Sequence, residues 1–79
     1  MNMKIIIIKG KYLTNRTPIN LFEGNLDEFI TYCVDNFKEW FLGDEASCES
    51  LAKYIIKQFN ESDKIVYCME VASWFKLIK

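Results

Sequence analysis

The stretch that decides the fold is "NLDEFITYCVDNFKEWFLG", residues 25–43. Its apolar residues recur at the 3.6-residue spacing of an amphipathic helix, which predicts one broad stripe facing a core. The members of this stripe are Leu26, Phe29, Ile30, Cys33, Val34, Phe37, Trp40 and Phe41. Asn25 is a favourable N-cap, and Glu28 stands three residues later in the capping-box position. Gly43 predicts the end of the helix.

A second helix is predicted directly after the first. Ser47 is its expected N-cap, and Glu49 and Lys53 form a favourably oriented i,i+4 pair. Its apolar stripe consists of Cys48, Leu51, Ala52, Ile55, Ile56 and Phe59. The polar segment "NESD", residues 60–63, is expected to break this helix.

Strand-like segments lie on both sides of the two helices. "MKIIIIKG" (residues 3–10) and "INLFE" (19–23) predict a hairpin, with the turn cluster "TNRTP" (14–18) between them. The segment "KIVYCMEVASWFKLIK" (64–79) predicts one long bent strand, or two short strands that meet near Ala72 and Ser73. We therefore expect a single α+β domain, residues 1–79, in the order β-β-α-α-β(-β). Two consecutive helices then pack on one face of a small antiparallel or mixed sheet, as a two-layer domain.

Composition narrows the class of protein. The longest uninterrupted apolar run, Ile5–Ile8, is too short to span a bilayer, and no export signal is visible. We therefore expect a cytoplasmic protein, in the host cytoplasm if a phage encodes it, with no membrane contact. Cys33, Cys48 and Cys68 form no C-x-x-C pair, so they are expected to be reduced and buried. Nine lysines against one arginine, with ten isoleucines and six asparagines, are typical of an AT-rich genome.

The residue content argues against most enzyme chemistry. The chain has no histidine, which removes the usual base of a nucleophile pair and the commonest metal ligand. The glycines are isolated, so no phosphate-cradling loop is predicted. Asp44 and Glu45 are a pair of carboxylates, but acids in front of a helix are usually explained by the helix dipole. We expect no enzyme activity, no metal and no cofactor.

The charge is unevenly distributed along the chain. Residues 17–52 carry eight acids and a single base, Lys38, although the net charge of the whole chain is only −1. At 100° per residue, Glu28, Asp35 and Glu39 lie opposite the apolar stripe of the first helix. Asp44, Glu45 and Glu49 extend this acidic row. The row is either a solvated helix face or a surface that mimics phosphates in the nucleic-acid groove of a partner. The basic residues are scattered, so direct nucleic-acid binding is not expected.

A second feature of the sequence concerns the sheet. Both candidate central strands are apolar on both faces, whereas two helices cover only one face. The other face must be covered by the "SWFKLI" tail (residues 73–78), by a second copy of the chain, or by a target. Trp74 and Phe75 are the aromatic residues of that tail and are candidate contact residues.

These observations predict a non-enzymatic small binding protein. In size, pattern and AT-rich composition the chain resembles phage anti-defence or host-takeover proteins, although no motif links it to one family. The resemblance implies an inhibitor of a host nuclease or other nucleic-acid-handling or defence protein, similar to anti-CRISPR or anti-restriction proteins. The partner-binding residues would be Glu28, Asp35, Glu39, Asp44, Glu45, Glu49, Trp74 and Phe75. The alternative is a homo-oligomeric structural or regulatory protein, antitoxin-like, that self-associates (for example as a homodimer) through its open apolar sheet face.

Overall fold

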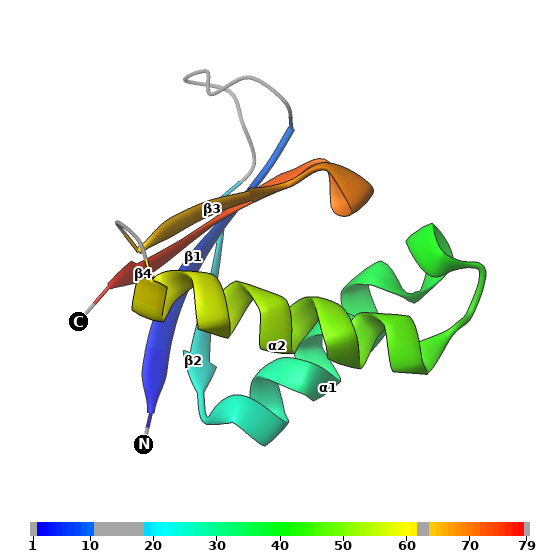
Figure 1. Cartoon of the computed structure of the whole chain (residues 1–79), viewed down its shortest axis with the longest axis horizontal. Coiled ribbons are helices and arrows are strands. Elements are labelled where there is room, and N and C mark those ends of the chain that lie inside the picture. The colour runs from blue at the N-terminus through cyan, green and yellow to red at the C-terminus, as the bar shows by residue number, and fades with distance from the viewer. Residues whose placement is uncertain (1, 11–18, 62–63, 79) are drawn as a thin grey trace.

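The computed structural model describes residues 2–10, 19–61 and 64–78. Its four strands are β1 (Met3–Lys9), β2 (Ile19–Gly24), β3 (Ile65–Cys68) and β4 (Ser73–Ile78). They form one antiparallel sheet in the order β2-β1-β4-β3, so the two central strands come from opposite ends of the chain (Figure 1). The predicted α+β class and element order are confirmed, with the carboxyl-terminal segment divided into two strands.

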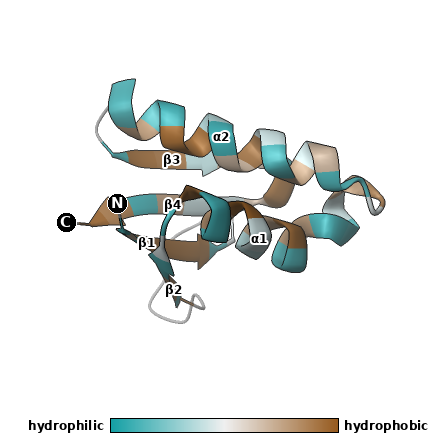
Figure 2. Ribbon diagram, turned by 90° about the horizontal axis from the view of Figure 1, so that it is seen from below, coloured by the Kyte–Doolittle hydropathy of each residue, from teal (hydrophilic) through white to brown (hydrophobic). Residues whose placement is uncertain are grey.

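Two helices, α1 (Leu26–Phe37) and α2 (Glu45–Glu61), form the second layer. They pack against each other, and α1 also contacts β2 while α2 contacts β3. Figure 2 shows α2 running alongside β3. On the same face of the sheet, α1 lies nearer to the opposite edge, which β2 forms. Two short 3-10 helices, η1 (Lys38–Phe41) and η2 (Met69–Val71), follow α1 and β3.

The start of α1 follows the predicted capping box. The Asn25 amide N–H donates to Glu28 Oε1 at 3.0 Å, and the Glu28 amide donates to Asn25 Oδ1 at 2.9 Å. Gly24 leaves the space for this arrangement, because a Cβ there would lie 3.0 Å from the Phe22 ring and 3.1 Å from Glu28 Cβ. The chain therefore passes from β2 into α1 without a connecting loop.

The predicted extension of the first helix to Gly43 is wrong. Phe37 leaves the helical conformation at φ −124° and ψ 3°, and η1 replaces the last predicted turn. Leu42 (φ 56°) and Gly43 (φ 85°) then adopt left-handed conformations, and the Gly43 amide donates to the Lys38 carbonyl at 2.8 Å. This tight reversal lets α2 return along α1. As a result Trp40, predicted on the buried stripe, is 57% exposed.

The predicted N-cap of the second helix is also wrong. Asp44, rather than Ser47, caps α2: its carboxylate accepts the Ala46 amide at 3.1 Å and the Ser47 hydroxyl at 2.7 Å. Both residue types are good caps, and the earlier one prevails because the chain reverses immediately before it. The helix also continues two residues into the predicted "NESD" break. Residues 62–63 and the predicted turn at 14–18 lie outside the described residues.

The core lies between the sheet and the two helices. Phe75 of β4 is fully buried at its centre, with ring centroids 6.4 Å from Phe29 and 5.9 Å from Phe37, both in edge-on geometry. Edge-on aromatic pairs of this kind add about 0.5–1.5 kcal/mol to the burial of their apolar area. The other buried apolar residues are Ile5, Ile7, Phe22, Cys33, Cys48, Leu51, Ala52, Ile55, Phe59, Val66, Cys68 and Val71.

Replacing Phe75 by alanine tests this core. Phe75→Ala removes a fully buried ring, and we expect the free energy of unfolding to fall by about 3–5 kcal/mol. The measurement is urea denaturation followed by circular dichroism. Lys76→Ala is the matched control, because the neighbouring side chain is exposed and should change stability by less than about 0.5 kcal/mol. A Phe75→Ala protein with the wild-type urea midpoint would contradict this core.

Candidate functional site

The strand register leaves one apolar face of the sheet outside the helical layer. Ile6 pairs with Leu21, while Ile8 pairs with both Ile19 and Trp74. Because alternate side chains of a strand point to opposite faces, these residues lie away from Ile5, Ile7 and Phe75. This open sheet face consists of Ile6, Ile8, Ile19, Leu21, Ile65, Tyr67, Trp74 and Ile78, with the charged residues Lys4, Glu23 and Lys76.

The open sheet face is most exposed at its two edges. Ile19 and Leu21 of β2 are 66% and 61% exposed, and Ile65 of β3 is 40% exposed. Towards the β3 edge, the rings of Tyr67 and Trp74 lie 4.9 Å apart. The indole N–H of Trp74 is shielded from solvent and has no hydrogen-bond partner within the described ranges. The exposed apolar side chains of this face are suited to contact with another protein.

The interpretation in which the "SWFKLI" tail folds over this face is wrong. Residues 73–78 are β4 itself, a central strand of the sheet, so they cannot also cover it. Trp74 lies on the open sheet face, as a contact residue should. Phe75 lies on the opposite face at 0% exposure and is withdrawn as a partner-binding residue, because a strand alternates its side chains.

Two residues of the predicted acidic row hold helix ends. Glu28 completes the capping box of α1, and Asp44 caps α2. Their carboxylates accept backbone N–H groups and lie at the positive ends of helix dipoles. Both therefore have a structural role that accounts for their presence without a partner.

Two further acids of the row pair with lysines. Glu45 Oε2 lies 4.0 Å from Lys38 Nζ, and Glu49 Oε1 lies 3.5 Å from Lys53 Nζ, in the predicted i,i+4 arrangement. All four side chains are at least half exposed, so each pair contributes less than about 1 kcal/mol. Lys38 and Lys53 therefore partly neutralise the negative charge of Glu45 and Glu49.

Asp35 and Glu39 are the acids of the row that remain available. Both are exposed, and within the described ranges neither carboxylate has a hydrogen bond or an ion pair. They line one shallow hollow together with Lys38. Glu39 belongs to η1 rather than to α1, so its direction departs from the regular helical wheel. The structure thus divides the predicted row of six acids: within the described ranges, only the carboxylates of Asp35 and Glu39 among them have no partner.

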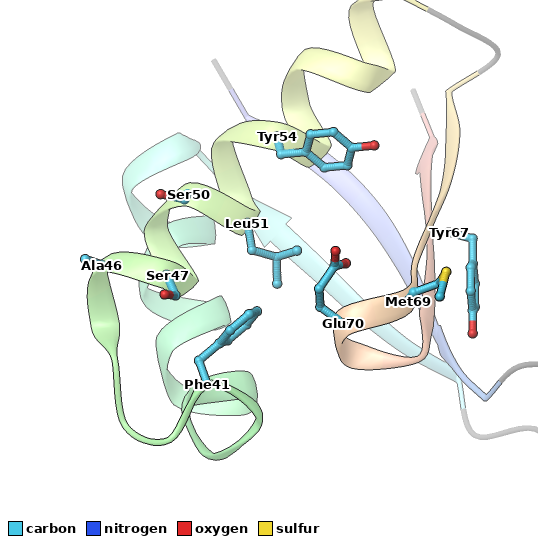
Figure 3. Close-up of a pocket in the computed structure, with 9 residues that line it drawn as sticks. All are labelled: Phe41, Ala46, Ser47, Ser50, Leu51, Tyr54, Tyr67, Met69 and Glu70. Atoms are coloured by element: carbon cyan, nitrogen blue, oxygen red, sulfur yellow. The ribbon is translucent and has the colours of Figure 1, made fainter.

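A groove that the sequence did not predict lies between α2 and η2 (Figure 3). We call it the η2 groove. Its volume is 600 Å³, and it is lined by Phe41, Ala46, Ser47, Ser50, Leu51, Tyr54, Tyr67, Met69 and Glu70. Sequence reasoning missed it because both predicted arrangements of residues 64–79 placed residues 69–71 in a strand, whereas they form the 3-10 turn that makes one wall. The sequence allowed a break near Ala72 and Ser73, but it did not indicate a 3-10 turn before it.

The three thiols lie in the core and are free. Burial raises the pKa of Cys33 to about 12, with a smaller contribution from the neighbouring Cys48 and Cys68. Burial also raises the pKa of Cys68 to about 12, with Glu70 acting in the same direction. The pKa of Cys48 is raised by burial and then by Asp44. Inaccessible thiols that resist ionisation are poor nucleophiles.

The described residues provide neither a metal-binding cluster nor a membrane-spanning helix. The described ranges hold no cluster of cysteine, aspartate and glutamate side chains placed to bind a metal ion. In the same part of the chain, no helix has the length and apolar character required to cross a membrane.

Comparison with known proteins identifies no relative. A scan against protein-family models and searches of curated proteins and of solved structures gave no match to this chain.

The buried thiols predict a loss of stability at high pH. An unfolded thiol ionises near pH 9, whereas Cys33 and Cys68 in the folded protein ionise near pH 12. Above pH 9 the unfolded state loses protons that the folded state retains, so unfolding becomes more favourable as the pH rises. We expect the free energy of unfolding to fall by about 3 kcal/mol between pH 8 and pH 10, from two thiols together.

Urea titrations at the two pH values measure this loss. The control is the Cys33→Ala, Cys68→Ala double variant, in which the difference between the two pH values should be clearly smaller; Cys48 and Tyr32, whose pKa values are also raised by burial, remain in it. An equal difference in wild type and variant would show that other groups cause it.

Proposed function

We propose that this protein is a non-enzymatic inhibitor of the phage or mobile-element type, which binds a nuclease or another nucleic-acid-handling protein of a host cell. The observation that carries the proposal is the separation of charge between the two layers. Residues 25–61, which include both helices, contain eight carboxylates and three lysines. The sheet and η2 segments (residues 2–10, 19–24 and 64–78) contain four lysines and two carboxylates.

An acidic layer of this kind is complementary to a surface that binds nucleic acid. Such surfaces are lined by lysine and arginine, because phosphate contacts supply most of their affinity. Opposite charge also steers the two proteins together before contact and raises the association rate. The basic residues are scattered along the sequence, which argues against direct binding of nucleic acid by this chain.

The residues that make direct contact differ from the full predicted row. Glu28 and Asp44 are committed to helix ends, and Glu45 and Glu49 to lysine pairs. These four contribute to the long-range field of the helical layer. Asp35 and Glu39 are exposed and lie together at one hollow, so we assign the specific contacts with a partner's basic residues to them.

Self-association is the second candidate function, and it uses the opposite layer. The open sheet face presents apolar side chains from all four strands. Two copies packed through this face would place their acidic helical layers on the outside, as far apart as the assembly allows. Electrostatic repulsion between the copies is then smallest, which favours a homodimer of the structural or antitoxin-like kind.

The first test reverses the exposed acidic pair. The Asp35→Lys, Glu39→Lys variant should fold normally, because exposed substitutions usually change stability by about 0.5 kcal/mol or less. Tagged wild type and variant are used to capture proteins from nuclease-treated bacterial lysate, and the affinity of the captured protein is measured. We expect a loss of at least about tenfold, larger at low salt, because screening shortens to about 8 Å at physiological ionic strength.

Its control carries the same change of charge elsewhere. Asp27→Lys, Glu61→Lys alters two exposed acids that lie outside the predicted row and should retain most of the affinity. Equal binding by wild type and the Asp35→Lys, Glu39→Lys variant, or a captured partner that does not handle nucleic acid, would contradict the proposal.

The second test addresses self-association. If the open sheet face forms a homodimer, Leu21→Lys should weaken it by more than about tenfold, since burial of a leucine is worth about 1.5–3 kcal/mol. Light scattering over a dilution series measures the mass. Leu42→Lys is the matched control, because Leu42 is 98% exposed and lies outside that face. A wild-type protein that is monomeric throughout the series excludes this second function.

A further inference from the structure

The η2 groove has two walls built from different parts of the chain. Phe41 of η1 and the amino-terminal half of α2 form one wall, and the other comes from η2 and Tyr67 of β3 (Figure 3). Its volume of 600 Å³ falls within the range of about 300–1,000 Å³ typical of ligand sites. Leu51 is buried at its base, while Tyr54 is 50% exposed at its side.

One charged side chain lies among the residues that line the groove. Figure 3 shows the Glu70 carboxylate pointing from η2 into the space between the walls. Within the described ranges this carboxylate has no hydrogen bond and no ion pair. The lining residues of α2, at positions 46, 47, 50, 51 and 54, share one helical face. Glu45 and Glu49 point away from that face, because each is about 130° or more from its centre.

One apolar side chain of the groove is strongly exposed. Met69, which lines the groove, is 80% exposed. Both 3-10 helices end in a non-glycine residue with a positive φ, Leu42 at 56° and Ala72 at 46°. Left-handed conformations are unfavourable for such residues and occur preferentially at functional sites. Both residues directly follow a 3-10 helix that supplies lining residues of the groove.

We propose that the η2 groove binds an extended protein segment in which an arginine or lysine stands beside aliphatic side chains. The aliphatic groups contact Phe41, Leu51 and Met69, and the cation meets the Glu70 carboxylate. The aromatic face of Tyr54 favours a cation as well. Arginine suits the site better than lysine, because its planar group is weakly hydrated and stacks on aromatic rings.

Two features select a protein segment of this chemistry as the occupant. The single carboxylate in an apolar lining is complementary to one positive charge with apolar neighbours, which a polypeptide supplies at adjacent side chains. Met69 lines the groove and is 80% exposed, so the groove stays open to solvent along one wall and can admit an extended segment. This proposal uses neither Asp35 nor Glu39, and the groove shares only Tyr67 with the open sheet face, so it stands independently of the proposed function.

The test is an NMR titration of the isotope-labelled protein with the probe peptide acetyl-Leu-Arg-Leu-Leu-Arg-Leu-amide. We expect saturable shifts of backbone amides at residues 41, 46–54 and 69–70. A peptide with glutamate in place of each arginine should bind at least about tenfold more weakly, because a charged hydrogen bond is lost and like charges meet. A peptide with serine in place of each leucine should lose a similar amount.

Variants of the protein complete the test. Glu70→Lys should abolish peptide binding and Glu70→Gln should weaken it, while Glu61→Lys, the same change outside the groove, should bind as wild type does. Glu70 is exposed, and circular dichroism verifies that each variant is folded.

Four results would overturn the proposal. The first is an absence of shifts, and the second is a set of shifts centred on the open sheet face or on Asp35 and Glu39. The third is equal binding of 4-phenylbutylamine and the peptide. The fourth is self-association of the free protein that the Glu70→Lys variant loses. The third result would assign the groove to a small amine, and the fourth to a second copy of the chain.

Discussion

The arrangement of the whole molecule depends on one constraint: the two helices are consecutive in the chain and lie between two pairs of strands. A sheet of four strands is about 19 Å wide, and two helices at about 10 Å each cover that width once. Both helices return to the same side, so that side is sealed and the other is not. Ile5 and Ile7 are completely buried, while Ile6 and Ile8 of the same strand are only partly covered. The open sheet face is a direct consequence of this order of elements.

The sequence predicted those parts of the fold that rest on local patterns. The element order, the capping box at Asn25 and the apolar faces of both helices follow from spacing and residue type. The end of α1 did not follow, because Trp40 and Phe41 fit the helical period as well as Phe37 does. The reversal depends on Leu42 in a left-handed conformation, which leucine disfavours, so only the packing of α2 against α1 explains it. For the same reason the η2 turn, closed by Ala72, could not be read from a run of strand-forming residues.

The candidate site was predictable only in part, since spacing places a carboxylate on a surface without showing what it does there. Glu28 and Asp35 occupy similar positions on the wheel, yet one accepts a backbone N–H and the other is free. Phe75 shows the complementary limit. The sequence identified an aromatic tail, but the strand pairing decides which aromatic faces the core, and Ile7 opposite Phe75 settles it. Long-range pairing is the information that a local pattern lacks.

Tyr67 connects the two apolar surfaces of the protein. It is paired with Trp74, with which its ring is in contact, and it also lines the η2 groove. It can reach both because β3 is an edge strand of only four residues, flanked on one side by the η2 turn. A short edge strand of this kind is a poor template for strand-to-strand aggregation. On the central strands, Lys4 and Lys76 add charge to the largely apolar open sheet face. The β3 edge is thus protected against unspecific backbone pairing with other strands. Binding to the open sheet face is then selected by the complementarity of side chains.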